Sequence, residues 1–131
     1  MGTSIFSKII QGEIPCYKVA ETNNCLAFLD INPLTKGHVL VIPKTEVDYI
    51  FDLDDTLYME LQLFAKQVAL AIKKVIDCNR VGVCVVGLEV PHAHIHLIPF
   101  NNMEEMNFAN KKLNLPVDEM KVIANSIASQ F

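Results

Sequence analysis

The sequence Val90-Pro91-His92-Ala93-His94-Ile95-His96-Leu97-Ile98-Pro99 contains three of the four histidines of the chain, each separated from the next by one apolar residue. Successive side chains of a β-strand point to opposite faces. The spacing therefore predicts a strand over residues 93–99, with the imidazoles about 6.6 Å apart on one face. The alternate residues Ala93, Ile95 and Leu97 would pack on a core, and the imidazoles would line a wall that a ligand can reach.

Such a wall of histidines has three interpretations. The rings can be structural, with their hydrogen bonds satisfied inside the protein, although strict alternation is an improbable product of chance. They can bind a metal, but zinc takes four protein ligands in structural sites and three plus a water in catalytic ones. They can also act in nucleophilic catalysis, in which one neutral imidazole attacks an electrophile and its neighbours stabilise the developing charge.

The composition is that of a globular protein. The chain has 131 residues, 51% of them hydrophobic, and a net charge of −4. The length fits a single domain over 1–131, and the hydrophobic content, with both helical and strand patterning, excludes a disordered chain. The negative charge argues against a non-specific nucleic-acid surface, but it leaves room for a local nucleotide pocket. No apolar run is long enough to span a membrane, and Met1-Gly2-Thr3 starts no signal peptide. We expect a cytoplasmic protein with reduced thiols at Cys16, Cys25, Cys78 and Cys84.

Hydrophobic periodicity predicts an α+β fold with an antiparallel sheet. Helices are expected at residues 4–11, 53–77 and 117–131, and strands at 16–21, 25–30, 38–43, 81–86 and 93–99. Ser4 is the expected cap of the first helix, and Asp54 or Asp55 of the second. The last helix should turn one set of residues inward: Val117, Met120, Ile123, Ala124 and Ile127. Residues 101–114 are polar, and we expect them to be mobile.

Four segments together resemble the histidine-triad (HIT) family of nucleotide hydrolases and transferases, most closely its Hint branch. They are the histidine run and residues 5–15 (IFSKIIQGEIP), 26–33 (LAFLDINP) and 37–44 (GHVLVIPK), which cover about residues 4–100 in the order of the family. The resemblance implies a five-stranded antiparallel sheet, a long helix and a C-terminal helix within the extension 101–131. It also implies a homodimer with the two sheets joined edge to edge, which would cover exposed strand edges. No cofactor is implied.

The implied activity is hydrolysis at the α-phosphate of purine nucleotide derivatives, either nucleoside phosphoramidates or dinucleoside polyphosphates. By resemblance His94 is the nucleophile that forms a nucleotidyl-histidine, with one ring nitrogen held protonated by a backbone carbonyl. His96 would stabilise charge on the phosphate, and His92 would orient its neighbours. His38, on the adjacent strand, would support the triad from behind through hydrogen bonds.

The nucleotide itself would bind beside the triad. Asp30 resembles the ribose ligand of the family, because a carboxylate can accept hydrogen bonds from both hydroxyls of a 2′,3′-diol. Its other interpretation is a turn-forming residue before Asn32-Pro33. Phe28 and Ile31 would sandwich the base. Phe6 and Ile9 are further candidates, which core packing explains about as well.

The chain departs from the family in two places. Many members approach the triad with a Gln and a Ser or Thr, where this chain has Leu88 and Glu89. Glu89 would then protonate an amine leaving group, hold a cation, or point away from the site. Some bacterial members also bind a structural zinc, and the corresponding positions here are Ser4, Ser7 and Glu46, which leaves only His92. Serine hydroxyls are poor zinc ligands beside thiolates, so we expect no metal of that kind.

Two other functions stay open on the sequence alone. One is a module that binds a purine nucleotide but turns it over slowly or not at all, because of the altered Glu89 loop. The other, weaker one is a metal-dependent enzyme that uses the three histidines as ligands.

Overall fold

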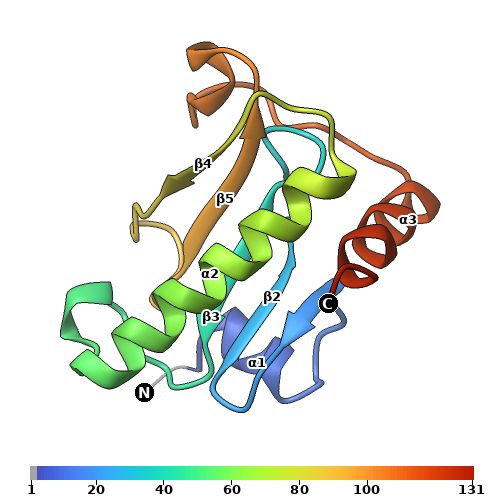
Figure 1. Cartoon of the computed structure of the whole chain (residues 1–131). Coiled ribbons are helices and arrows are strands. Elements are labelled where there is room, and N and C mark those ends of the chain that lie inside the picture. Colours follow the sequence, from blue (N-terminus) through green and yellow to red (C-terminus); the bar gives the residue numbers. More distant parts are fainter. Residues whose placement is uncertain (1–2) are drawn as a thin grey trace.

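The computed structural model describes residues 3–131 as a five-stranded antiparallel sheet with helices on both faces (Figure 1). The sheet order is β1-β2-β3-β5-β4. The strands are β1 (Lys18–Glu21), β2 (Cys25–Leu29), β3 (Val39–Pro43), β4 (Arg80–Cys84) and β5 (Ile95–Phe100). The helices are α1 (Ile5–Ile10), α2 (Asp55–Val75) and α3 (Val117–Ala128), with 3₁₀ turns η1 (Ile50–Asp52) and η2 (Met103–Met106). The predicted α+β fold is confirmed.

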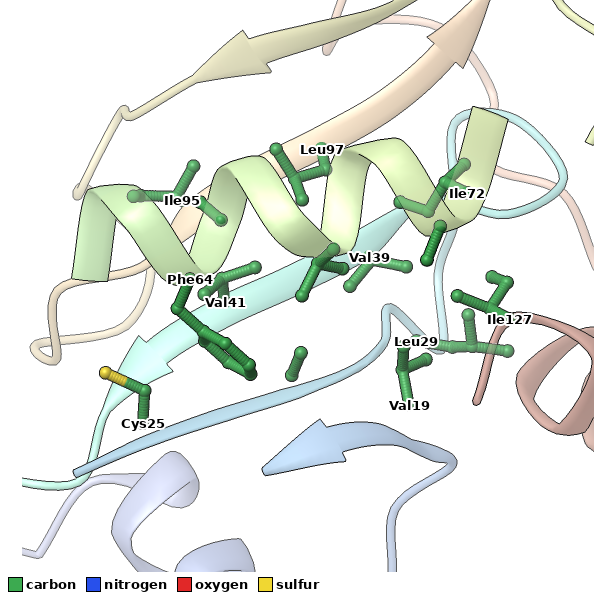
Figure 2. Close-up of a cluster of buried hydrophobic side chains, with 14 of the residues drawn as sticks. Val19, Cys25, Leu29, Val39, Val41, Phe64, Ile72, Ile95, Leu97 and Ile127 are labelled. Atoms are coloured by element: carbon green, nitrogen blue, oxygen red, sulfur yellow. The ribbon is translucent and has the colours of Figure 1, made fainter. Parts of the chain in front are cut away.

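The main core lies between the sheet and the helices α2 and α3, which lie on the same face in Figure 1. Asp54 caps α2, since its carboxylate accepts the N–H of Leu57 at 2.8 Å. The apolar stripe of α2 then faces the sheet, where Phe64 and Ile72 meet Val41 and Leu97 in Figure 2. This packing explains why Ala93, Ile95 and Leu97 are buried on the predicted core face of the histidine run.

The opposite face of the sheet carries a smaller apolar cluster under α1. Phe6 of α1 is buried against four strand residues: Leu26, Phe28, Leu40 and Ile42. Ser4 caps α1 as predicted, because its hydroxyl accepts the N–H of Ser7 at 3.0 Å. The two faces therefore differ: one is covered by long helices, and the other is left partly open around one short helix.

Two sequence predictions were wrong in detail. β5 begins at Ile95, so His92 and His94 precede the strand and only His96 lies within it. The pattern of alternation extends further along the chain than the hydrogen-bonded ladder does. Val117 is 57% exposed, although the other predicted inward residues of α3 are buried. Val117 is the first residue of α3, directly after the cap Pro116. It precedes the buried residues of the helix and stays exposed to solvent.

Residues 101–114 are not a loose linker. The N–H of Leu113 donates to the carbonyl of Pro33 at 2.9 Å. Met106 of η2 packs so closely on Gly82 of β4 that a Cβ there would lie 2.6 Å from the methionine Cε. These contacts tie the segment to the loop after β2 and to β4, and they bring Phe108 beside His96 on the open face, whereas its mobility stays a prediction.

Within residues 3–131 no helix is both long and apolar enough to cross a membrane. Cys16, Cys25, Cys78 and Cys84 are free thiols in the structure, with Cys25 and Cys78 buried and Cys16 and Cys84 half-buried.

Candidate active site

The histidines meet on the open face of the sheet. The register of the strands places Phe28, Leu40 and His96 in one row across β2, β3 and β5. The rings of His94 and His96 are 4.9 Å apart, edge to face. Both line a cavity of about 140 Å³, whose other walls are Val86, Gly87, Leu88, Glu89 and Phe108.

A backbone carbonyl fixes the proton of His94. Its Nδ1 lies 2.8 Å from the carbonyl oxygen of His92. A carbonyl oxygen can only accept, so Nδ1 carries the hydrogen. In the neutral ring the lone pair is then on Nε2, which is the form of imidazole that can attack an electrophile.

A backbone N–H fixes the proton of His96, through His38. Leu34 N–H donates to His38 Nδ1 at 3.0 Å, so the neutral His38 ring carries its hydrogen on Nε2. That nitrogen lies 3.0 Å from His96 Nδ1 and donates to it. The neutral His96 ring must then carry its own hydrogen on Nε2. The two neighbouring rings thus offer opposite groups through Nε2, a lone pair on His94 and an N–H on His96.

His92 does not belong to the wall that a ligand can reach, contrary to the prediction for all three imidazoles. Its side chain is 0% exposed and lies beneath α1. Nε2 donates to the carbonyl of Pro43 at 2.8 Å, and Nδ1 accepts from the Ser4 hydroxyl at 2.7 Å. The ring acts on the site only through its backbone carbonyl, which holds His94.

Burial keeps the supporting rings neutral. It lowers the pKa of His38 to about 3 and that of His96 to about 4, and the neighbouring imidazoles add to both shifts. Burial also lowers the pKa of His92. These three rings are therefore neutral near pH 7, as the hydrogen-bond assignments above require.

Asp30 lies at the end of β2, directly beside His38. Its Oδ1 accepts the N–H of Asn32 at 2.9 Å, which is the turn role weighed from the sequence. Its Oδ2 lies 3.6 Å from His38 Nε2, too far for a good hydrogen bond. Burial raises the pKa of Asp30, the Asn32 amide opposes the rise, and the charge of Glu89 adds to it. Asp30 thus makes a turn and also keeps acceptor capacity beside the histidines.

The predicted base-binding residues differ in their exposure. Phe6 and Phe28 are buried and stack edge to face at 5.5 Å, and Phe6 also meets the ring of His94 at 5.1 Å. Ile9 is half-buried in the same cluster, and Ile31 is 66% exposed. Of this set, only Ile31 presents a largely free apolar surface next to Asp30.

The sequence analysis missed Phe108 and Lys112. The Phe108 ring stands edge-on to His96, with 4.8 Å between the centroids, and lines the same cavity as Glu89. Lys112 Nζ donates to the carbonyls of Phe108 and Asn110, which holds this part of the chain in place. A single aromatic residue in a polar segment was the only signal, and it does not say where the ring docks.

The donors in the site fit a metal poorly. Among residues 3–131, one group has ligand atoms close enough together for an ion: Asp30, His38 and His96. His38 already accepts the Leu34 N–H at Nδ1, so ligation through Nε2 would cost either this bond or the last proton of the ring. Only one histidine of the triad belongs to the group, so the three together do not form a chelate.

The lowered pKa values predict that acid destabilises the fold. The unfolded chain protonates each histidine near pH 6.5, but folded His38 and His96 take up a proton only near pH 3 to 4. Their contribution is fully present above about pH 6.5 and is lost as the pH falls, by up to about 1.4 kcal/mol per pH unit for each ring. Urea unfolding at pH 6.5 and 5.0 should show this loss, with a smaller one in His38→Gln. An equal loss in both proteins would contradict the assignment.

Comparison with known proteins agrees with this geometry. The family model described as "HIT domain" matches residues 11–103. An uncharacterized HIT-like protein of Borreliella burgdorferi is 38% identical over 95% of both chains. An adenosine 5′-monophosphoramidase of Schizosaccharomyces pombe is 37% identical over 97% of both.

The fold matches as well. A crystal structure of a HIT-like protein involved in cell-cycle regulation from Bartonella henselae, with an unknown ligand, superimposes with a TM-score of 0.85 at 28% identity. It covers 98% of this chain and 97% of that one. The chain described here belongs to the HIT-domain family.

Proposed function

We propose that the protein hydrolyses purine nucleoside 5′-phosphoramidates at the α-phosphate, through a covalent nucleotidyl intermediate on His94. The observation that carries the proposal is the pair of opposite tautomers, a bare Nε2 on His94 beside an Nε2–H on His96 in one cavity. A nucleophile next to a hydrogen-bond donor is what attack on a phosphoryl group requires.

The reaction runs in two displacements. The Nε2 lone pair of His94 attacks the α-phosphorus, and the P–N bond to the leaving amine breaks. The amine departs with that electron pair and takes a proton from Glu89, while the His96 N–H donates to a phosphoryl oxygen. Water then attacks the phosphorus, the bond to His94 breaks, and the proton released by water returns to Glu89. The products are an amine and a nucleoside monophosphate.

The nucleoside would lie along the open face beside α1. Asp30 would accept hydrogen bonds from the ribose hydroxyls with the oxygen that the Asn32 amide leaves free. Ile31 would cover one side of the base, and the Phe6 and Phe28 pair would support the other. Ile9 completes the apolar floor under α1.

Charge favours a phosphoramidate over a dinucleoside polyphosphate. The Asp30 carboxylate lies close to His38 and His96, and both of these rings are neutral. A single α-phosphate brings less negative charge into these surroundings than a polyphosphate chain does. The relative from Schizosaccharomyces pombe is named an adenosine 5′-monophosphoramidase, which supports the same choice.

Removal of the nucleophile tests the proposal. His94→Ala should lose hydrolysis of adenosine 5′-phosphoramidate by about a thousandfold or more, because no covalent intermediate forms. Intact-mass spectrometry should detect one adenylyl group on the wild type and none on the variant. AMP binding by calorimetry should persist in both, which shows that the fold is intact.

The result also separates the alternatives. Near-normal turnover by His94→Ala would refute the mechanism. A wild-type protein that forms the adduct in a burst and releases it very slowly would be the binding module considered from the sequence. Restoration of His94→Gly activity by added imidazole would place the nucleophile at this position.

Glu89 is proposed to protonate the leaving amine, a role that its place in the wall of the cavity allows. Glu89→Gln should slow phosphoramidates with poor leaving groups by about 10²-fold, the lower range for a lost general acid. Activated esters, whose leaving group needs no proton, should react nearly as fast as before. An equal effect on both substrates, or no effect on either, would assign the proton to another group.

We also propose a homodimer joined through β4, which lies at the edge of the sheet and pairs with β5. Val83 of β4 and Leu63 of the adjacent α2 are each 62% exposed, so the open edge continues into an apolar surface. Leu63→Lys should shift the mass measured by light scattering from dimer to monomer. Val122→Lys, at an equally exposed position of α3, is the matched control and should stay dimeric. A monomeric wild type would refute the dimer.

A further inference from the structure

A polar network lies beneath the triad, on the side away from the cavity. Ser4 and Ser7 come from the N-terminus of α1, and Glu46 comes from the loop after β3. Ser4 and Ser7 are buried, whereas Glu46 is exposed. None of these three residues has a place in the reaction or in nucleotide binding as proposed above. A buried hydroxyl without a hydrogen-bond partner destabilises the fold, so the partners of Ser4 and Ser7 are structurally important.

One set of protons satisfies both ring nitrogens of His92, with the Ser4 hydroxyl donating to His92 at 2.7 Å in preference to Ser7 at 3.2 Å. Pro43 accepts from His92 Nε2–H, which leaves His92 Nδ1 as an acceptor for the Ser4 hydroxyl at 2.7 Å. Ser7 donates its only hydroxyl proton to Glu46 Oε1 at 2.6 Å. The proton beside His92 therefore comes from Ser4, since that of Ser7 is committed to the carboxylate.

Glu46 anchors the network at its outer end. The same Oε1 also accepts the backbone N–H of Ser4 at 2.8 Å. The hydrogen bonds from Ser7 and Ser4 lower the pKa of Glu46, so the carboxylate is ionised near pH 7 and cannot donate. One exposed carboxylate thus fixes both the end of α1 and the direction of the buried hydroxyls.

The network reaches the reacting ring through the backbone. His92 is held at both ring nitrogens, and its carbonyl oxygen accepts from His94 Nδ1. A shift of the His92 ring would move this carbonyl, and the His94 ring would follow. α1 also places Phe6 edge-on to both His92 and His94, so the end of the helix and the ring are coupled twice.

We propose that Glu46, Ser7 and Ser4 are positioning residues that hold the His92 ring at Nδ1, while the Pro43 carbonyl holds it at Nε2, and that they thereby fix the orientation of His94 through the His92 carbonyl. The effect of this network on catalysis rests on the proposed function, in which His94 is the nucleophile. The hydrogen bonding of the His92 ring does not depend on that function.

The test reads the rings and the reaction separately. Long-range ¹H–¹⁵N correlation on histidine-labelled protein distinguishes a protonated ring nitrogen from a bare one. In the wild type it should find His92 protonated at Nε2 and His94 at Nδ1. In Glu46→Ala and Ser4→Ala the His92 Nδ1 signal should move toward that of a ring nitrogen without an ordered hydrogen-bond donor, while the Pro43 carbonyl keeps Nε2 protonated. kcat for adenosine 5′-phosphoramidate should fall by about tenfold, as expected for one lost net hydrogen bond, with KM nearly unchanged.

Two further variants distinguish the charge and the position of Glu46 from a non-specific effect of removing a carboxylate near α1. Glu46→Gln keeps an acceptor oxygen for Ser7 and Ser4 without the charge, so it should recover most of the wild-type spectrum and kcat. Glu13→Ala removes an exposed carboxylate beyond the end of the same helix and should change neither. Because Glu46 is exposed, its variants should fold even if Ser4→Ala does not.

Each outcome is decisive for the network. Unchanged His92 signals in a folded Glu46→Ala protein would overturn the proposal, whatever the rate does. A loss of kcat without a change of the His92 Nδ1 signal would also overturn it, because the effect would then run by another route. If the wild type forms no nucleotidyl adduct, the proposed function fails, and the spectra still decide whether the network fixes His92.

Discussion

The hydrogen bond from His94 Nδ1 to the carbonyl of His92 is the constraint on which the rest of the site depends. A carbonyl inside a sheet ladder usually accepts from the next strand and is not free for a side chain. Here the chain bends before the ladder starts: His92 N–H donates to Val90 and Ala93 N–H to Val47. β5 begins only at Ile95, so the His92 carbonyl remains available. The late start of the strand is therefore what allows the bond.

Backbone groups set every tautomer in the site that the structure assigns. Pro43 fixes His92, His92 fixes His94, and Leu34 fixes His38, which in turn fixes His96. Peptide groups do not titrate near pH 7. They therefore hold the protons of the imidazole rings more reliably than an ionisable side chain would. Burial lowers the pKa of His38 and His96, which keeps both rings in the neutral form that the scheme needs. The two faces of the sheet therefore have different roles. One packs against α2 and α3 to form the core, and the other holds the imidazoles in place.

The sequence predicted those features that follow from side-chain pattern. Alternation in the histidine run correctly separated Ala93, Ile95 and Leu97 from the imidazoles, and the polar residues Ser4 and Asp54 marked the helix starts. The features that it missed depend on backbone groups or on tertiary docking. The amide of Leu34 has no signature in the residue type. Phe108 is one aromatic residue in a polar segment, and only the packing of Met106 on Gly82 shows where it goes. Periodicity also cannot tell where a ladder begins, so it placed the start of β5 too early.

Neutral imidazoles also bear on what the site recognises. A site that binds polyphosphate through charge relies on Lys or Arg, and its affinity comes largely from ion pairs. In this cavity the donor toward phosphate would be the N–H of an uncharged His96, with the carboxylate of Asp30 not far away. Lys112 is engaged with two backbone carbonyls and serves to hold Phe108. Recognition in the proposed reaction thus depends on which ring nitrogens of His94 and His96 carry protons. The polar network at the end of α1 holds the ring of His92, whose carbonyl fixes the proton of His94. A site organised in this way suits one singly charged phosphate whose leaving group needs a proton, because the position of protons is what the fold controls most closely.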